Sequence, residues 1–232
     1  MSAPVPAPVG VVVAVDGPSG SGKSSTARGV ARVLGYRYLD TGAMYRAMTW
    51  WMLQQDVDVH DRQAVASLAA RPVLTVSTDP DVPHVEVDGH DVTNAIRDPE
   101  VTRAVSAVSA VSEVRARLVQ VQQAAMAGGG IVVEGRDIGT VVAPDAQVKV
   151  YLVASTSARA ARRAADLAHH SVTVADTHAS LERRDAMDST REISPLTQAK
   201  DAVEIDSTAM SLDEVVEAVV SLVRSATGED AR

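Results

Sequence analysis

The chain of 232 residues contains no cysteine, no phenylalanine and only one asparagine. Without cysteine there can be no disulfide, no thiolate zinc site and no cysteine nucleophile, and the composition suits a reducing compartment. Aromatic residues make up only 3% of the chain, although 46% of it is hydrophobic. The core must therefore be built from valine, alanine, leucine, isoleucine and methionine.

Long apolar runs and an excess of basic charge are missing as well. No apolar run approaches the roughly 20 residues that span a bilayer, and the opening MSAPVPAP lacks the basic residues of a signal peptide. The net charge of −8 argues against nucleic-acid binding through a broad basic field. We therefore expect a soluble cytoplasmic protein that binds neither membrane nor nucleic acid, with a monomer as its simplest state.

Apolar runs alternate with helical patterns along most of the chain. This alternation predicts an α/β fold, with a parallel sheet covered by helices on both faces. We expect five strands, at 9–16, 36–40, 131–134, 148–153 and 203–206. Helices are expected at 24–34, 43–54, 115–127 and 156–168, and a capping box at Ser211-Leu212-Asp213-Glu214 opens a last helix.

Two segments interrupt this alternation. Residues 73–92 alternate apolar and polar, with turn signals at Asp79-Pro80-Asp81 and Asp88-Gly89, which predicts a small antiparallel sheet. Residues 169–195 are rich in histidine, aspartate, arginine and serine, and we expect them to form an excursion over the sheet. Because ligands bind at the carboxyl ends of parallel strands, both segments are expected to take part in substrate selection.

One octapeptide fits the pattern G-x-x-x-x-G-K-[ST], namely Gly17-Pro18-Ser19-Gly20-Ser21-Gly22-Lys23-Ser24. It lies between an expected strand and an expected helix, as a loop that binds nucleoside triphosphates must. There the backbone N–H groups surround phosphate oxygens, Lys23 reaches the terminal phosphates, and the Ser24 hydroxyl can bind Mg²⁺. A glycine- and serine-rich turn that matches by chance is disfavoured, because strand, loop and helix are all in register.

Other residues narrow the class of protein. A GTPase needs an Asn-Lys-x-Asp run, but the only asparagine is Asn94 in Thr93-Asn94-Ala95-Ile96. A large ATPase would need a longer chain, which leaves a small kinase with a second substrate opposite the loop. Thr41 as an N-cap, Gly42 and Arg46 would form a second phosphate pocket, although a plain cap and a surface arginine remain the alternative.

Specific blocks of the chain resemble bacterial cytidylate kinases, which are nucleoside-monophosphate kinases. These blocks are GPSGSGKSS (17–25), LDTGAMYR (39–46), DVTNAIRDPEV (91–101), SEVRARL (112–118), EGRDIGTVV (134–142), REISPL (191–196) and EIDST (204–208). The resemblance implies one P-loop kinase domain over 1–232, with a central parallel sheet flanked by helices. Its core would be 9–40, 106–162 and 195–225, its monophosphate-binding region with the antiparallel insert 41–105, and its short lid about 163–194.

The resemblance also implies a role for each matching residue. The CMP phosphate would be held by Thr41, Arg46 and Arg136, and cytosine and its surroundings would be read by Ser106, Arg115, Asp137 and Arg191. Since SAVSAVS repeats every three residues, the serine could instead be Ser109 or Ser112. Arg184 and Asp188 would face the sugar and phosphate. Residues 17–25, ending at Ser25, would bind ATP together with Arg159 and Arg163, unless these two arginines form a solvated basic face. The residues implied to act in catalysis are Lys23, Arg136, Arg163 and Arg184, and Ser24 would bind Mg²⁺. Glu134 stands where some relatives have aspartate.

The expected reaction is ATP-dependent phosphorylation of CMP and dCMP to CDP and dCDP by in-line transfer. Cytosine offers an amine donor beside two acceptors, so the Asp137 carboxylate with arginine and serine donors complements it. The phosphate nucleophile is already charged at neutral pH and needs no general base. Two alternatives remain, a kinase for a non-nucleotide small molecule and an ATP-dependent regulatory protein without transfer activity.

Overall fold

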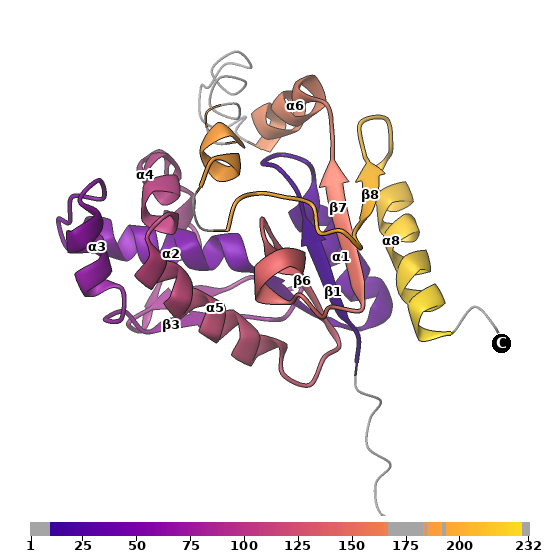
Figure 1. The fold of residues 1–232 in the computed structure, drawn as a ribbon, viewed down its shortest axis with the longest axis horizontal. Helices are drawn as coiled ribbons and strands as arrows, with labels where there is room; N and C mark the ends of the chain where they lie inside the picture. Colours follow the sequence, from indigo (N-terminus) through magenta and orange to yellow (C-terminus); the bar gives the residue numbers. More distant parts are fainter. Residues whose placement is uncertain (1–9, 167–182, 184, 192–193, 229–232) are drawn as a thin grey trace, which may run out of the picture.

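A central parallel sheet organises the molecule (Figure 1). The structure, a computed structural model, describes residues 10–166, 183, 185–191 and 194–228, with the side chains of 163–166 outside the description. The sheet has five strands in the order β2-β6-β1-β7-β8. Their bounds are Val12–Asp16 for β1, Arg37–Asp40 for β2, Ile131–Gly135 for β6, Val148–Val153 for β7 and Val203–Asp206 for β8. All five predicted strands are confirmed, and the start predicted for the first, Val9, lies outside the described residues.

Helices cover the two faces of this sheet, because successive residues of each strand point to opposite sides. Val13 and Val15 of β1 pack with α1 (Lys23–Leu34) and α8 (Leu212–Thr227). Ala14 points to the other face, where the buried cluster includes α2 (Thr41–Gln54), α4 (Pro99–Ser109) and α5 (Ser112–Met126). Helix α6 (Thr156–Asp166) follows β7 and lies beyond the carboxyl end of that strand in Figure 1.

The predicted antiparallel insert is confirmed as a three-stranded sheet in the order β3-β4-β5. Its strands are Leu74–Val76, Val85–Val87 and His90–Asp91. Val85 and Val87 belong to the same buried cluster as Met44 and Met48 of α2. The insert is also tied to the edge of the main sheet, because the Tyr38 N–H donates to the carbonyl of Thr78 at 2.8 Å.

The N-termini of α8 and α2 are both capped by a side chain, and one of the two caps differs from the prediction. The capping box at Ser211 is confirmed: its hydroxyl accepts from the Glu214 N–H at 3.3 Å, and its own N–H donates to the Glu214 carboxylate at 2.7 Å. The prediction that Thr41 is an N-cap is wrong. Asp40 caps α2 by accepting from the Ala43 N–H at 2.9 Å, and Thr41 is the first helical residue. A carboxylate caps as well as a hydroxyl, so the Thr41 side chain is released for another contact.

Several short elements were not predicted from the sequence. They are α3 (Arg62–Leu68), the 3₁₀ helix η1 (Ala95–Arg97), helix α4 and the π-helix η2 (Ile138–Val142). Among the helices that the structure describes, none combines the length and the apolar character needed to cross a bilayer.

Candidate active site

Three neighbouring strands end at the same edge of the sheet and carry the predicted motifs there. Strand β1 leads into Gly17, β2 into Thr41 and β6 into Arg136. Because these strands are parallel and adjacent, their following loops surround one cavity of about 530 Å³. Ser19 to Thr26 line one wall, and another is lined by Asp40 to Ala43, Tyr45 and Arg46. The two predicted phosphate sites therefore share one cavity.

The glycine-rich loop needs its glycines for steric reasons. Gly20 and Gly22 have φ values of +78° and +96°, which favour glycine. At Gly17, a Cβ atom would lie 2.1 Å from the carbonyl oxygen of Leu152. The resulting turn leads directly into α1, so the N-terminus of this helix lies at the cavity, where a helix end favours an anion.

Lys23 is buried at the start of α1 and points back into the loop. Its Nζ donates to the Pro18 carbonyl at 2.7 Å and to the Ser21 hydroxyl at 3.4 Å. Burial lowers the pKa of Lys23, and the nearby Arg136 guanidinium lowers it further. A phosphate entering the loop would oppose both effects, because an adjacent anion favours the charged form of the amine.

Ser24 belongs to a hydrogen-bonded chain of three side chains. Its hydroxyl donates to Glu134 at 2.9 Å, and the Tyr38 hydroxyl donates to the other carboxylate oxygen. Glu134 is buried, and its pKa is raised by burial first and then by the neighbouring Asp40 carboxylate. The sequence left the role of Glu134 open, and Tyr38 was not singled out at all.

The wall opposite the loop is rich in guanidinium groups. Arg46 donates to the Thr102 hydroxyl at 2.9 Å and to the Ile96 carbonyl at 3.3 Å. Arg136 donates through Nε to Asp188 at 2.9 Å, and Arg191 pairs with the other oxygen of that carboxylate. Six described arginines line the cavity, namely Arg46, Arg97, Arg115, Arg136, Arg162 and Arg191. This wall is thus suited to a second anion.

Asp137 and Arg115 form a buried ion pair beside that wall. Arg115 also donates to the Ser109 carbonyl at 3.3 Å, and its guanidinium lies 5.4 Å from the centre of the Tyr45 ring. Ser106 and Ser109 both line the cavity. Ser112, the third serine of the repeat, is exposed and donates to Glu113, so the cavity involves the first two positions of the repeat.

Thr41 contacts β6, the strand that leads to Asp137. Its hydroxyl donates to the Glu134 carbonyl at 2.7 Å and lies within the cavity lining. The predicted acceptor residues Thr41, Arg46, Ser106, Arg115, Arg136, Asp137, Asp188 and Arg191 are therefore brought together. Arg184, the remaining one, lies outside the described residues.

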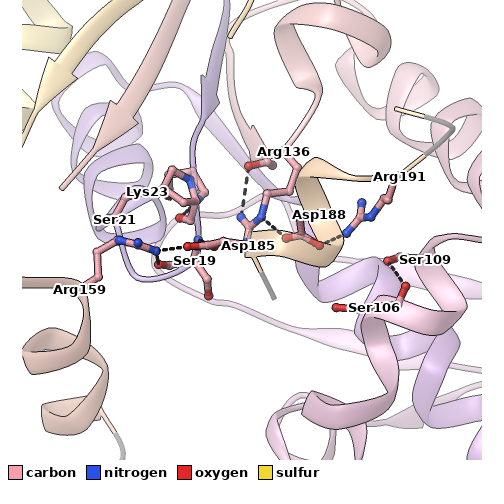
Figure 2. Close-up of polar contacts among 12 residues, drawn as sticks. Ser19, Ser21, Lys23, Ser106, Ser109, Arg136, Arg159, Asp185, Asp188 and Arg191 are labelled. Carbon is pink, nitrogen blue, oxygen red and sulfur yellow. Dashed lines mark hydrogen bonds and ion pairs between the residues drawn. The ribbon is translucent and has the colours of Figure 1, made fainter. Parts of the chain in front are cut away.

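Arg159 of α6 reaches the phosphate-binding loop (Figure 2). Arg159 is buried, donates to the Ser19 carbonyl at 3.1 Å and pairs with Asp185, so a solvated basic face is wrong for this residue. Arg162 was missed: it lines the cavity and donates to the carbonyls of Ser21 at 3.3 Å and Ser207 at 2.6 Å. Its only signal in the sequence is its place one helical turn after Arg159. The side chain of Arg163 lies outside the description.

A phosphate-binding loop on a five-stranded parallel sheet, facing an arginine-lined wall in the same cavity, defines a P-loop phosphotransferase with an anionic second substrate. A family model described as cytidylate kinase matches residues 13–225. The chain belongs to the cytidylate kinase family.

Individual relatives agree with this assignment. The chain is 54% identical to a cytidylate kinase of Streptomyces griseus, with 92% of each protein covered. It is 56% identical to that of Streptomyces coelicolor over the same shares. The cytidylate kinase of Enterococcus faecalis is 45% identical, with 92% of this chain and 96% of the relative covered.

Proposed function

We propose that this enzyme phosphorylates CMP and dCMP with ATP, by direct transfer between two nucleotides bound in one cavity. The family predicts this reaction. The observation that carries the proposal is the cavity itself, which places a phosphate-binding loop opposite an arginine-lined wall with a buried carboxylate beside it. Such an arrangement suits one nucleoside triphosphate and one nucleoside monophosphate.

On the acceptor side, Thr41, Arg46 and Arg136 would hold the CMP phosphate. Asp137 would accept from the cytosine amine, while Arg115, Arg191 and the Ser106 hydroxyl would supply donors to N3 and O2. Asp188, already bound by Arg136 and Arg191, would orient both arginines and face the sugar. Arg184 keeps its predicted role toward sugar and phosphate.

On the donor side, the loop residues 17–25 would bind the triphosphate of ATP. Lys23 would neutralise its terminal phosphates, assisted by Arg159 and, as predicted from the sequence, Arg163. Because Arg162 lines the cavity beside the loop, we add it to the donor set.

The residues around Ser24 also fit a magnesium ion. The Ser24 hydroxyl offers an oxygen ligand and the Glu134 carboxylate lies 2.9 Å from it, so the site has the oxygen chemistry that Mg²⁺ prefers. When bound, Mg²⁺ would neutralise charge on the donor phosphates. Ser24 would be its ligand from the protein, and Tyr38 would keep Glu134 turned toward Ser24.

Transfer needs no general base in this site. The second pKa of a phosphate monoester is about 6, so the acceptor oxygen is already anionic at neutral pH. The remaining task is to bring two anions together in line, which costs electrostatic repulsion. Lys23 and the arginines on both walls offset that repulsion, and the shared cavity supplies the orientation.

The larger-scale assignments from the sequence stay part of the proposal. The enzyme would act as a monomer in the cytoplasm, with residues 41–105 as the monophosphate-binding region and about 163–194 as a lid. The insert strands and α2 share one buried cluster, which supports treating 41–105 as a unit.

A coupled assay tests the reaction. With Mg-ATP as donor, we expect turnover with CMP and dCMP, little with UMP or AMP, and none with shikimate. Lys23→Ala should lose at least about 100-fold in turnover, the scale of one electrostatic group at a transition state, while far-UV circular dichroism stays unchanged. ATP binding without turnover on any acceptor would refute the proposal, as would full activity of Lys23→Ala.

A further inference from the structure

Asp185 makes direct contacts with the phosphate-binding loop. One carboxylate oxygen accepts from the backbone N–H of Ser19 at 3.3 Å, and the other pairs with Arg159 (Figure 2). Arg159 in turn donates to the Ser19 carbonyl at 3.1 Å. The side chain of Asp185 is 20% exposed, so this contact is partly shielded from water. An anion that the chain itself supplies thus lies on the loop.

These partners are the ones that a phosphate would use. A backbone N–H of a glycine-rich loop and a guanidinium are both phosphate donors, and a carboxylate binds such donors with two oxygens in the same way. If the loop binds the donor triphosphate, as the proposed function holds, then Asp185 and a phosphate compete for Ser19 N–H and Arg159.

The helical segment that carries Asp185 also contacts the arginine-lined wall opposite the loop, which we call the acceptor wall. Asp188, three residues later, accepts from Arg136 and pairs with Arg191. Residues three apart lie on the same side of a helix. The segment 185–190 thus holds the Asp185 carboxylate against the phosphate-binding loop and the Asp188 carboxylate against the acceptor wall, as Figure 2 shows.

We infer that Asp185 is an internal competitor of the donor nucleotide, which sets its affinity by occupying the loop of the empty enzyme. A triphosphate must displace the carboxylate, since two anions cannot share these donors. Displacement frees Arg159 to bind phosphate. The apparent affinity for ATP is then lower than the intrinsic one by the fraction of enzyme in which Asp185 has left the loop.

The test is the affinity for a donor analogue in the absence of CMP. Isothermal titration calorimetry with Mg²⁺ and the β,γ-imido analogue of ATP would compare the wild type with Asp185→Asn. The asparagine keeps the shape but loses the charge, so we expect its dissociation constant to fall by about 3- to 10-fold, as for one partly exposed charged contact. Asp185→Ala, which also removes the acceptor oxygens, should tighten binding at least as much.

A matched control separates this effect from a general change of charge. Asp206 is exposed, its carboxylate lies near Arg162 of the donor side, and it bonds to Thr208 rather than to the loop. Asp206→Asn removes the same charge and should change the dissociation constant less than 2-fold, the scale of a weak exposed pair. CMP affinity measured on each variant reports whether its fold is intact.

Each outcome is decisive. Tighter binding in both Asp185 variants but not in Asp206→Asn supports the competition. Equal or weaker binding in the Asp185 variants overturns it, because Asp185 would then only position Arg159. Equal tightening in Asp206→Asn also overturns it, as a general charge effect. If the wild type binds no analogue, the proposed donor site itself fails and the competition with it.

Discussion

Asp137 has two roles in the proposed site, and a substitution affects both of them. It neutralises Arg115 in a buried ion pair, and in the proposed site its remaining lone pairs accept from the cytosine amine. Removing one partner of a buried pair leaves an uncompensated charge and costs about 3–5 kcal/mol. A truncation at this position would remove both the charge and the acceptor of Arg115, whereas an isosteric amide removes the charge but keeps an oxygen for Arg115.

We predict that Asp137→Asn lowers the preference for CMP over UMP. The asparagine amide can donate to the O4 carbonyl of uracil, which the aspartate carboxylate repels. A mispairing of this kind is worth about 1–3 kcal/mol, so the ratio of kcat/KM for the two substrates should fall by about 5- to 150-fold. Steady-state kinetics with both monophosphates measures this ratio, with KM for ATP as the internal control. An unchanged ratio would limit Asp137 to its structural pair with Arg115.

At the residue scale, the sequence predicted those residues that belong to a motif. Lys23, Arg136 and Asp137 stand at fixed places in a loop or at a strand end, and the structure brings them to one cavity. Residues whose role depends on a distant partner were missed. Arg162 reaches Ser207, and Asp185 reaches Ser19, across 45 and 166 positions of the chain. Patterns among neighbouring residues in a sequence do not indicate contacts between residues so far apart in the chain.

Helices α1 and α8 pack closely on one face of the sheet. The contact point on α1 is Gly29, where an added Cβ atom would lie 2.6 Å from the Cγ2 atom of Val216 on α8. Valine is stiff at χ1, so its methyl group cannot simply turn away. The position of α1, and with it the phosphate-binding loop at its N-terminus, therefore depends on the absence of a side chain at residue 29.

We predict that Gly29→Ala destabilises the protein although alanine favours helices. The helical preference contributes about 1 kcal/mol in favour of the variant, but overpacking costs about 1–3 kcal/mol. The net loss in the free energy of unfolding should therefore be up to about 2 kcal/mol, measured by urea titration. On a Val216→Ala background the clash is gone, so the same substitution should stabilise by about 1 kcal/mol. Destabilisation on both backgrounds would show that another contact is responsible.

At the scale of elements, the prediction rested on the alternation of strand and helix patterns and on the capping signals at helix ends. The five strands, the antiparallel insert and the capping box of α8 follow from local patterns, and all are confirmed. Helix α4 was missed, although its buried Val101, Ala104, Val105 and Val108 recur at helical spacing in the sequence. The N-cap of α2 was placed one residue late, because Asp40 and Thr41 are both good caps and only the Thr41–Glu134 contact decides between them.

At the scale of the whole molecule, Asp16 joins the central strand to the acceptor wall. It ends β1, and its carboxylate accepts from the N–H groups of Ile138 at 2.8 Å and Gly139 at 2.7 Å, directly after the Arg136-Asp137 pair. Burial raises the pKa of Asp16 to about 6, with a smaller contribution from Asp137, against the opposing effect of the two N–H groups. The junction between the sheet and the site is therefore sensitive to pH.

The sign of this sensitivity follows from the two states. Between pH 4 and 6 the folded protein keeps the Asp16 proton while the unfolded chain, with a pKa near 3.8, loses it. This contribution to stability is therefore fully present below about pH 4 and is lost as pH rises through about 6. Relative to Asp16→Asn, which cannot titrate, the wild type should lose up to about 3 kcal/mol over that range. Urea unfolding of both proteins at pH 4, 5, 6 and 7 measures the difference, from which the other carboxylates cancel. A difference that stays constant with pH would mean that Ile138 and Gly139 hold the carboxylate ionised throughout, and that the junction between β1 and these residues does not depend on its protonation.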